Sequence, residues 1–188
     1  MTDSLDKAGA LPKFKYHPDP ITTGSIIRSS LKCTQCQLIR GWTYAGPIYG
    51  RFDDEPVLCP WCIADETAHQ LLGAEFVDPL GVGGYGDWDA VAHTVIEEIC
   101  FRTPSFNGWQ QEKWYTHCND AAVFVGCAGR RELEALDRAA HDFIKSESGY
   151  TDKEWALYFN RLDIDRSPTA YLFRCRHCNS WGGYSDCD

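Results

Sequence analysis

Apolar residues recur at helical spacing in four stretches of the chain. The pattern predicts helices over residues 64–72, from about 87 until just before Pro104, over 130–146, and from residue 151 onward. Thr151-Asp-Lys-Glu154 has the spacing of a capping box, in which the threonine and glutamate side chains bond the free amides at a helix start. Gly73 follows the first helix at the position where glycine often ends one.

Stretches rich in β-branched and aromatic residues predict strands between these helices. They cover residues 21–31, 38–44, 121–126 and 169–173. We therefore expect an α+β fold, in which a zinc-ribbon-like antiparallel hairpin packs on a mixed body of helices and sheet. The predicted parts are a flexible tail (1–12), an N-terminal zinc-ribbon-like module (13–74) and an α+β body with a C-terminal Cys-x-x-Cys knuckle (75–188), together one compact unit. No element is assigned to the aromatic segment 103–120.

The composition and the start of the chain predict a globular, cytoplasmic protein. Of the 188 residues, 44% are hydrophobic and 13% aromatic, which is typical of a globular protein. No basic region followed by an apolar core opens the chain, and the longest apolar run, 121–129, is too short to span a bilayer. We expect a cytoplasmic protein with no membrane partner. In that reducing compartment its ten cysteines are expected to be metal ligands or redox groups rather than to form disulfides.

The net charge narrows the choice of partners. It is −9 with cysteines neutral, and a zinc ion held by four thiolates would bring it to about −11. Such a chain repels nucleic acid unless a basic patch intervenes, and Lys32, Arg40 and Arg51 are too few to make one. The charge favours a basic protein partner and no nucleic acid.

Two Cys-x-x-Cys pairs, Cys33/Cys36 and Cys59/Cys62, are separated by 22 residues. Two such knuckles facing each other supply the tetrahedral thiolate cage that zinc prefers. Cys59-Pro-Trp-Cys62 could instead exchange disulfides, but the expected βαβ context is missing and a second pair lies nearby. The sequence therefore predicts a closed structural zinc site, which serves folding rather than catalysis.

A third knuckle, Cys175-Arg-His-Cys178, has no fourth pair and predicts a second zinc site together with Cys118. Candidates for the remaining ligand are His117, His177, Cys127 and Asp120, besides Cys187 near the C-terminus. His117 and Cys118 would point in opposite directions on an extended strand, which favours one of them as ligand over both. The alternative is that Cys118 and Cys127 are core cysteines and that Cys175 and Cys178 form a free dithiol.

The sequence resembles the CbrC family, which is associated with colicin tolerance. The resemblance rests on the Cys33–Cys36 pair and on blocks such as Phe14-Lys-Tyr-His-Pro-Asp-Pro20, Leu58-Cys-Pro-Trp-Cys-Ile-Ala64, Trp114-Tyr-Thr-His-Cys-Asn-Asp120 and Tyr171-Leu-Phe-Arg-Cys-Arg-His-Cys178. Segments 44–49, 102–104 and 109–112 complete it, so that it runs from residue 14 to about 178. It implies a bacterial cytosolic protein with a role in tolerance or immunity toward a protein toxin, and supplies no catalytic residues.

Three classes of function follow. The first, which we favour, is a zinc-stabilised binding protein that neutralises a basic toxin such as a nuclease. The second is a zinc-dependent enzyme at Cys118, Cys175 and Cys178, if an open coordination position there activates water with Asp120 or His117 accepting the proton. The third, a nucleic-acid-binding or regulatory zinc ribbon, is disfavoured by the charge.

Overall fold

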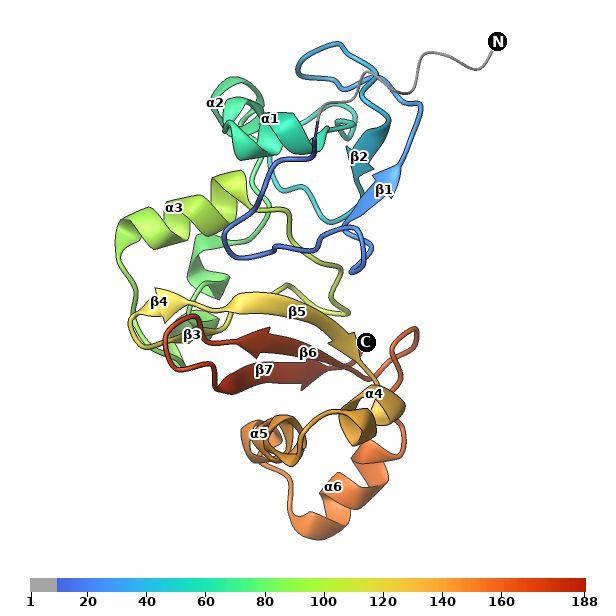
Figure 1. Ribbon diagram of the computed structural model, residues 1–188, viewed down its shortest axis with the longest axis vertical. Helices are drawn as coiled ribbons and strands as arrows, with labels where there is room; N and C mark the ends of the chain where they lie inside the picture. The colour runs from blue at the N-terminus through green and yellow to red at the C-terminus, as the bar shows by residue number, and fades with distance from the viewer. Residues whose placement is uncertain (1–9) are drawn as a thin grey trace.

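The computed structural model describes residues 10–188, so most of the predicted tail, residues 1–9, lies outside the described part. Helices and small antiparallel sheets are both present, which confirms the α+β prediction. Along the longest axis the chain forms an N-terminal part, a central helix and sheet, and a C-terminal group of helices (Figure 1). Three clusters of buried apolar side chains follow this same order.

The N-terminal part holds a two-stranded antiparallel sheet of β1 (Ile26–Arg28) and β2 (Trp42–Tyr44), followed by α1 (Pro60–Ala64) and α2 (Thr67–Leu72). Both strands are shorter than the sequence pattern predicts, because a long loop with the first Cys pair separates them. The single helix predicted over 64–72 is two short ones. Glu66, in a left-handed conformation with φ of 67°, separates them.

A segment of 3₁₀ turns leads into the central helix. The turns are η1 (Pro79–Gly81) and η2 (Gly84–Gly86), and the helix is α3 (His93–Arg102). The prediction that this helix begins near residue 87 is wrong. Trp88 lies outside the helix, its indole faces Tyr115 with ring centroids 5.1 Å apart, and α3 starts only after Ala92 in extended conformation.

The central sheet has the order β5-β6-β7, all antiparallel: β5 (Val123–Ala128), β6 (Thr169–Arg174) and β7 (Trp181–Asp186). Predicted strands 121–126 and 169–173 correspond to β5 and β6, although β5 starts two residues later and has a register shift between Phe124 and Gly126. A short hairpin of β3 (Thr116–His117) and β4 (Asp120–Ala121) occupies the unassigned segment before it. Phe106, Trp114, Phe124 and Phe173 form a buried aromatic cluster against the sheet.

Three helices complete the C-terminal side: α4 (Arg130–Ala135), α5 (Arg138–Ser148) and α6 (Asp152–Phe159). The single helix predicted over 130–146 is interrupted, because Leu136 is extended and Asp137 caps α5 by accepting a hydrogen bond from the Ala140 amide. The capping box predicted at Thr151 and Glu154 is present at the start of α6. Helix α5 packs against β7.

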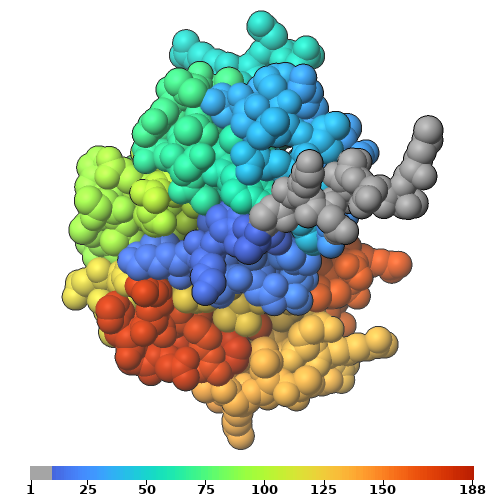
Figure 2. Space-filling view, turned by 45° about the horizontal axis from the view of Figure 1, so that its top comes forward, coloured from blue at the N-terminus to red at the C-terminus, as the bar shows by residue number. Residues whose placement is uncertain are grey.

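The described N-terminal segment packs on two parts of the molecule: Phe14 belongs to the buried cluster of the N-terminal part and Tyr16 to that of the central sheet. It crosses the middle of the molecule, between the N-terminal part and the C-terminal strands (Figure 2). The Tyr16 carbonyl accepts from the Phe124 amide at 2.8 Å, and His17 contacts the Pro104 carbonyl at 2.7 Å. Tyr16 and His17 are fully buried there.

Candidate metal centres

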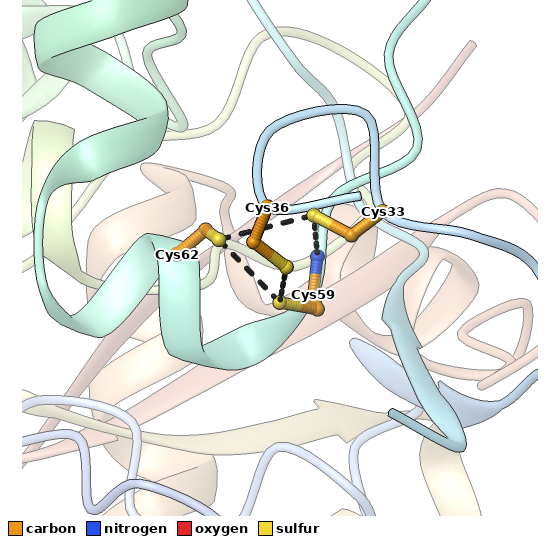
Figure 3. Close-up of side chains that lie close together, drawn as sticks. All are labelled: Cys33, Cys36, Cys59 and Cys62. Atoms are coloured by element: carbon orange, nitrogen blue, oxygen red, sulfur yellow. Dashed lines mark hydrogen bonds between the residues drawn. The ribbon is translucent and has the colours of Figure 1, made fainter. Parts of the chain in front are cut away.

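The two Cys pairs of the N-terminal part meet in one place, which we call the first cluster (Cys33, Cys36, Cys59 and Cys62). Their four Sγ atoms lie within 4.8 Å of one another. Cys33 and Cys36 reach the cluster from the loop between β1 and β2, whereas Cys59 precedes α1 and Cys62 lies on it (Figure 3). Cys33, Cys59 and Cys62 are only 1–3% exposed.

The sulfur separations fit a tetrahedral metal ion. Bonds of about 2.3 Å from such an ion to its sulfurs separate the sulfurs by about 3.8 Å. The Cys33–Cys62 and Cys36–Cys59 pairs are each 3.8 Å apart, and the Cys59–Cys62 pair 3.6 Å. A disulfide would need about 2.05 Å. The cluster therefore has the dimensions of a metal cage.

Backbone hydrogen bonds shape the first knuckle. The Cys33 amide donates to the Leu38 carbonyl at 3.0 Å, and the Gln37 amide donates back to the Cys33 carbonyl at 2.9 Å. Gln37 turns the chain with a φ of 60°. The Cys59 amide donates to the Cys33 Sγ at 3.4 Å, which joins the two knuckles and stabilises charge on that sulfur.

The electrostatics of the first cluster call for a cation. A hydrogen bond from Cys59 lowers the pKa of the Cys33 thiol to about 4, while burial raises the pKa of the Cys62 thiol to about 12. Without a bound cation the cluster would thus keep protons at neutral pH. Burial alone would lower the pKa of the Arg40 guanidinium. The hydrogen bond to Cys36 and the negative charge of the neighbouring sulfurs have a larger combined effect, so this pKa is raised. The donor set fits a metal ion that binds thiolates.

A second cluster lies at the end of the central sheet, formed by His117, Cys118, Cys175 and Cys178. Their ligand atoms also lie within 4.8 Å of one another. Cys118 and Cys178 have sulfurs 3.9 Å apart, and the His117 Nδ1 is 3.3 Å from the Cys118 Sγ and 3.5 Å from the Cys178 Sγ. A tetrahedral ion places a nitrogen and a sulfur ligand about 3.6 Å apart. Hence this cluster has the dimensions of a metal cage as well.

His117 and Cys118 both belong to the second cluster, contrary to the expectation from an extended strand. They lie at the turn of the β3–β4 hairpin, where His117 pairs with Asp120 across a two-residue loop. Cys118 and Asn119 have φ of 56° and 57°, as a type I′ turn requires. The chain reverses at Cys118, and both side chains therefore reach the same point.

The third knuckle repeats the hydrogen bonds of the first one. The Cys175 amide donates to the Ser180 carbonyl at 2.9 Å, and the Asn179 amide donates to the Cys175 carbonyl at 3.1 Å. Asn179, four residues after the first cysteine like Gln37, has a φ of 57°. Hydrogen bonds from Ser180 lower the pKa of the Cys178 thiol to about 6, which favours a thiolate at neutral pH.

The other candidate ligands lie elsewhere. Cys127 is on β5, half-buried, and burial raises the pKa of its thiol to about 11. His177 turns away from the second cluster, and its Nε2 lies 3.1 Å from the Asp120 carboxylate. Asp120 in turn accepts from the Tyr16 hydroxyl at 2.6 Å and from the Arg176 guanidinium at 2.7 Å. Cys187, also considered from the sequence, is exposed near the C-terminus. Of these candidates, His117 is the one that lies with Cys118, Cys175 and Cys178 and could be the fourth donor, whereas Asp120 joins the third knuckle to the N-terminal segment.

The two clusters differ in their contact with solvent. Three of the four cysteines of the first cluster are buried, whereas Cys118 and Cys178 of the second cluster are exposed and Cys175 is buried. All ten cysteines are free thiols in the structure. In residues 10–188, no helix has the length and apolar character needed to cross a membrane.

These features define a small α+β protein with two Cys-based clusters that could hold metal ions. The sequence matches the uncharacterised protein family UPF0167 over residues 11–187, and the chain belongs to that family. It is 40% identical to the UPF0167 protein Mb2317 of Mycobacterium bovis and, equally, to MT2352 of Mycobacterium tuberculosis, over 94% of this chain and 93% of each relative. It is 37% identical to PA1536 of Pseudomonas aeruginosa, over 89% of this chain and 92% of that protein. No solved structure matches.

Proposed function

We propose that both clusters hold zinc and that the protein works by binding another protein rather than by catalysis. The observation that carries this proposal is the position of His117, which gives the second cluster a fourth donor. Three thiolates with one imidazole, or four thiolates, are the ligand sets of structural zinc sites. Such a site leaves no position for water or substrate, and its free energy of binding stabilises the fold.

Cobalt substitution tests the proposed ligand sets. Replacing zinc with Co²⁺ in the folded protein should give the intense visible bands of tetrahedral cobalt–thiolate sites at two equivalents of metal per chain. His117→Ala should alter the spectrum of one equivalent and leave the other unchanged. A weak spectrum typical of five- or six-coordinate cobalt at the second cluster would contradict a closed site. That result would favour the alternative, a zinc-dependent enzyme at Cys118, Cys175 and Cys178.

The partner we propose is a basic protein toxin, such as a nuclease domain, which the protein would neutralise in the bacterial cytoplasm by covering its active surface. Two facts support it: the net charge of −9, which a four-thiolate zinc site makes more negative, and the resemblance to a family associated with colicin tolerance. Complementary charge accelerates association and selects the partner.

Binding to purified toxin nuclease domains tests the partner. Titration over a salt series should give a dissociation constant that rises steeply with ionic strength, and the complex should inhibit the nuclease. Lysozyme, a basic protein that is not a toxin nuclease, is the matched control and should bind far more weakly. Equal binding of both, or no binding to any toxin domain at low salt, would contradict the proposal.

A further inference from the structure

A surface groove lies between the 3₁₀ turns and the start of α3. It has a volume of about 500 Å³ and is lined mainly by apolar side chains, among them Leu80, Val82, Trp88, Val91 and Ile96. Leu80 is 70% exposed at its rim and Tyr85 50% exposed. We call it the Trp88 groove. Exposed apolar side chains around a hollow of this size are typical of a binding site.

Among the described residues, Asp89 is the only charged one that lines the Trp88 groove, and no described Lys, Arg or His lines it. Asp78 and Asp87 flank the lining segments in the sequence, and the negative charge of Asp78 contributes to a raised pKa of the Tyr85 hydroxyl, after the larger effect of burial. An apolar surface with an acidic rim is complementary to apolar side chains flanked by lysine or arginine.

Hydrogen bonds from the β3–β4 hairpin, which carries His117 and Cys118 of the second cluster, fix one wall of the Trp88 groove. The Thr116 hydroxyl donates to the Asp89 carbonyl at 2.6 Å, and the Asn119 amide donates to the Asp89 carboxylate at 3.4 Å. Trp88 covers Gly84, where an added Cβ would lie 2.8 Å from the indole, and its ring also packs on Tyr184. The Tyr85 backbone has a φ of 61°, a conformation that costs energy outside glycine.

We propose that the Trp88 groove binds an extended basic segment of a protein partner, with apolar side chains in the groove and lysines or arginines against Asp78, Asp87 and Asp89. This inference rests on the proposed binding function and identifies the surface of this protein that contacts the partner. The fixed walls would let the segment bind with little reorganisation of this protein.

Binding of a short synthetic peptide to the full-length, zinc-loaded protein tests the inference. The probe is Lys-Lys-Phe-Lys-Leu-Lys-Lys, followed by ¹⁵N NMR. We expect saturable shifts of the Trp88 indole resonance and of the Gly83 and Asp89 amides. Replacing Phe and Leu in the peptide with Gly should abolish the shifts, and so should replacing its lysines with Glu. Shifts spread over the whole acidic surface, or no saturation, would overturn the proposal.

Matched leucine variants test the groove with a readout independent of the peptide's design. Leu80→Ser should weaken peptide binding about tenfold, because it removes exposed apolar area at the rim. Leu157→Ser, which changes a leucine 66% exposed on α6, should leave the affinity unchanged. Asp87→Asn should reduce the salt dependence of binding, whereas Asp53→Asn in the N-terminal loop should not.

The same variants separate this inference from the proposed function. If a toxin domain binds and Leu80→Ser weakens its binding as it weakens that of the peptide, both the groove proposal and the toxin proposal are supported. If the toxin domain binds with equal affinity to the wild type and to Leu80→Ser, the groove proposal is overturned and the binding function remains. If the peptide binds in the groove but no toxin domain does, the toxin proposal fails alone.

Discussion

At the scale of single residues, Asp120 connects three parts of the chain. Its carboxylate accepts from Tyr16 of the N-terminal segment and from Arg176 and His177 of the third knuckle. Burial alone would raise its pKa, but the hydrogen bonds from Tyr16 and His177 outweigh burial and lower it. The carboxylate therefore stabilises the fold most above its unfolded pKa, and this contribution is lost as the pH falls through the folded one.

Asp120→Asn should destabilise the protein by about 1–2 kcal/mol at pH 7, because it removes the charge that pairs with Arg176 and weakens the hydrogen bond to the buried Tyr16 hydroxyl. Urea unfolding followed by tryptophan fluorescence measures the change. Asp142→Asn is the control, because Asp142 pairs with Arg138 on the exposed side of α5, so its substitution should have little effect on stability. Equal small effects would mean that Asp120 does not hold the segment.

His17 gives a prediction on pH. It is fully buried; its Nδ1 lies 2.7 Å from the Pro104 carbonyl, which can only accept, so Nδ1 carries the proton. Its Nε2 then accepts from the Thr23 hydroxyl. Burial lowers its pKa from 6.5 to about 4. Between these values the unfolded chain binds the extra proton, so acidification favours unfolding by up to roughly 3 kcal/mol.

His17→Gln should therefore flatten the dependence of unfolding free energy on pH between about 4 and 6.5. The variant's stability at pH 7 should also be lower, by about 1–3 kcal/mol, because glutamine cannot reproduce both hydrogen bonds. Unfolding free energies of both proteins over this pH range give the answer. Acid also protonates metal-binding cysteines, but it does so equally in both proteins, so the difference between the curves isolates His17. Parallel curves would contradict the assignment.

The sequence predicted which cysteines gather in the candidate sites better than it predicted how the neighbouring side chains are arranged. Cys33, Cys36, Cys59 and Cys62 do come together as their spacing predicts, and Cys118 joins Cys175 and Cys178. The position of His117 was not predictable from strand alternation, because Cys118 and Asn119 form a left-handed turn. An Asn after the cysteine was the only signal for that turn in the sequence. The Trp88 groove was not predicted either, although its lining residues all lie within residues 79–96, because the helical spacing of Trp88 and Ile96 predicted a helix where the chain instead makes 3₁₀ turns.

At the scale of elements, β7 shows why the sequence pattern misses one strand of the three-stranded sheet. Trp181-Gly-Gly-Tyr184 contains two adjacent glycines, which disfavour strand predictions. The structure requires them: a Cβ at Gly182 would lie 1.9 Å from the Tyr115 ring, and one at Gly183 would lie 2.1 Å from the Tyr171 carbonyl oxygen. The pattern also failed to predict the break between α4 and α5. Apolar residues keep helical spacing across this break, although Asp137 caps the second helix.

Gly182→Ala should destabilise the protein by about 2–4 kcal/mol, because Tyr115 would have to leave its place in the aromatic core. Gly149→Ala is a matched control: its added methyl meets open space, and only its φ of 67° is unfavourable, so it should cost about 1 kcal/mol. Thermal unfolding of the two variants measures the difference. Equal costs would contradict the close packing of Tyr115 on β7.

The β3–β4 hairpin should depend on the metal of the second cluster. Cys178→Ala should remove one metal equivalent and increase hydrogen exchange at residues 114–122, because the hairpin would lose its link to the third knuckle. Cys127→Ala, which changes a cysteine outside both clusters, should keep both metal ions and normal exchange. Unchanged exchange in Cys178→Ala would show that packing alone holds the hairpin.

At the scale of the whole molecule, the clusters lie in different parts of the fold, one in the N-terminal module and one at the end of the central sheet (Figure 1). Their unequal exposure predicts an order of metal loss. A chelator should take metal from the second cluster first, because its Cys118 and Cys178 face solvent while Cys33, Cys59 and Cys62 are buried. Release followed with a chromogenic chelator should show two phases, and Cys178→Ala should lack the fast one. A single phase would contradict this order.

The most direct test of the account is the zinc content of the purified protein, measured as metal per chain by mass spectrometry under native conditions and by elemental analysis. We predict two zinc ions per chain, one of which is lost in His117→Ala or Cys178→Ala and the other in Cys59→Ala. One zinc ion per chain, unchanged by substitution of His117 or Cys178, would contradict the second site. A protein that folds fully without metal would contradict the central claim that both clusters are structural zinc centres.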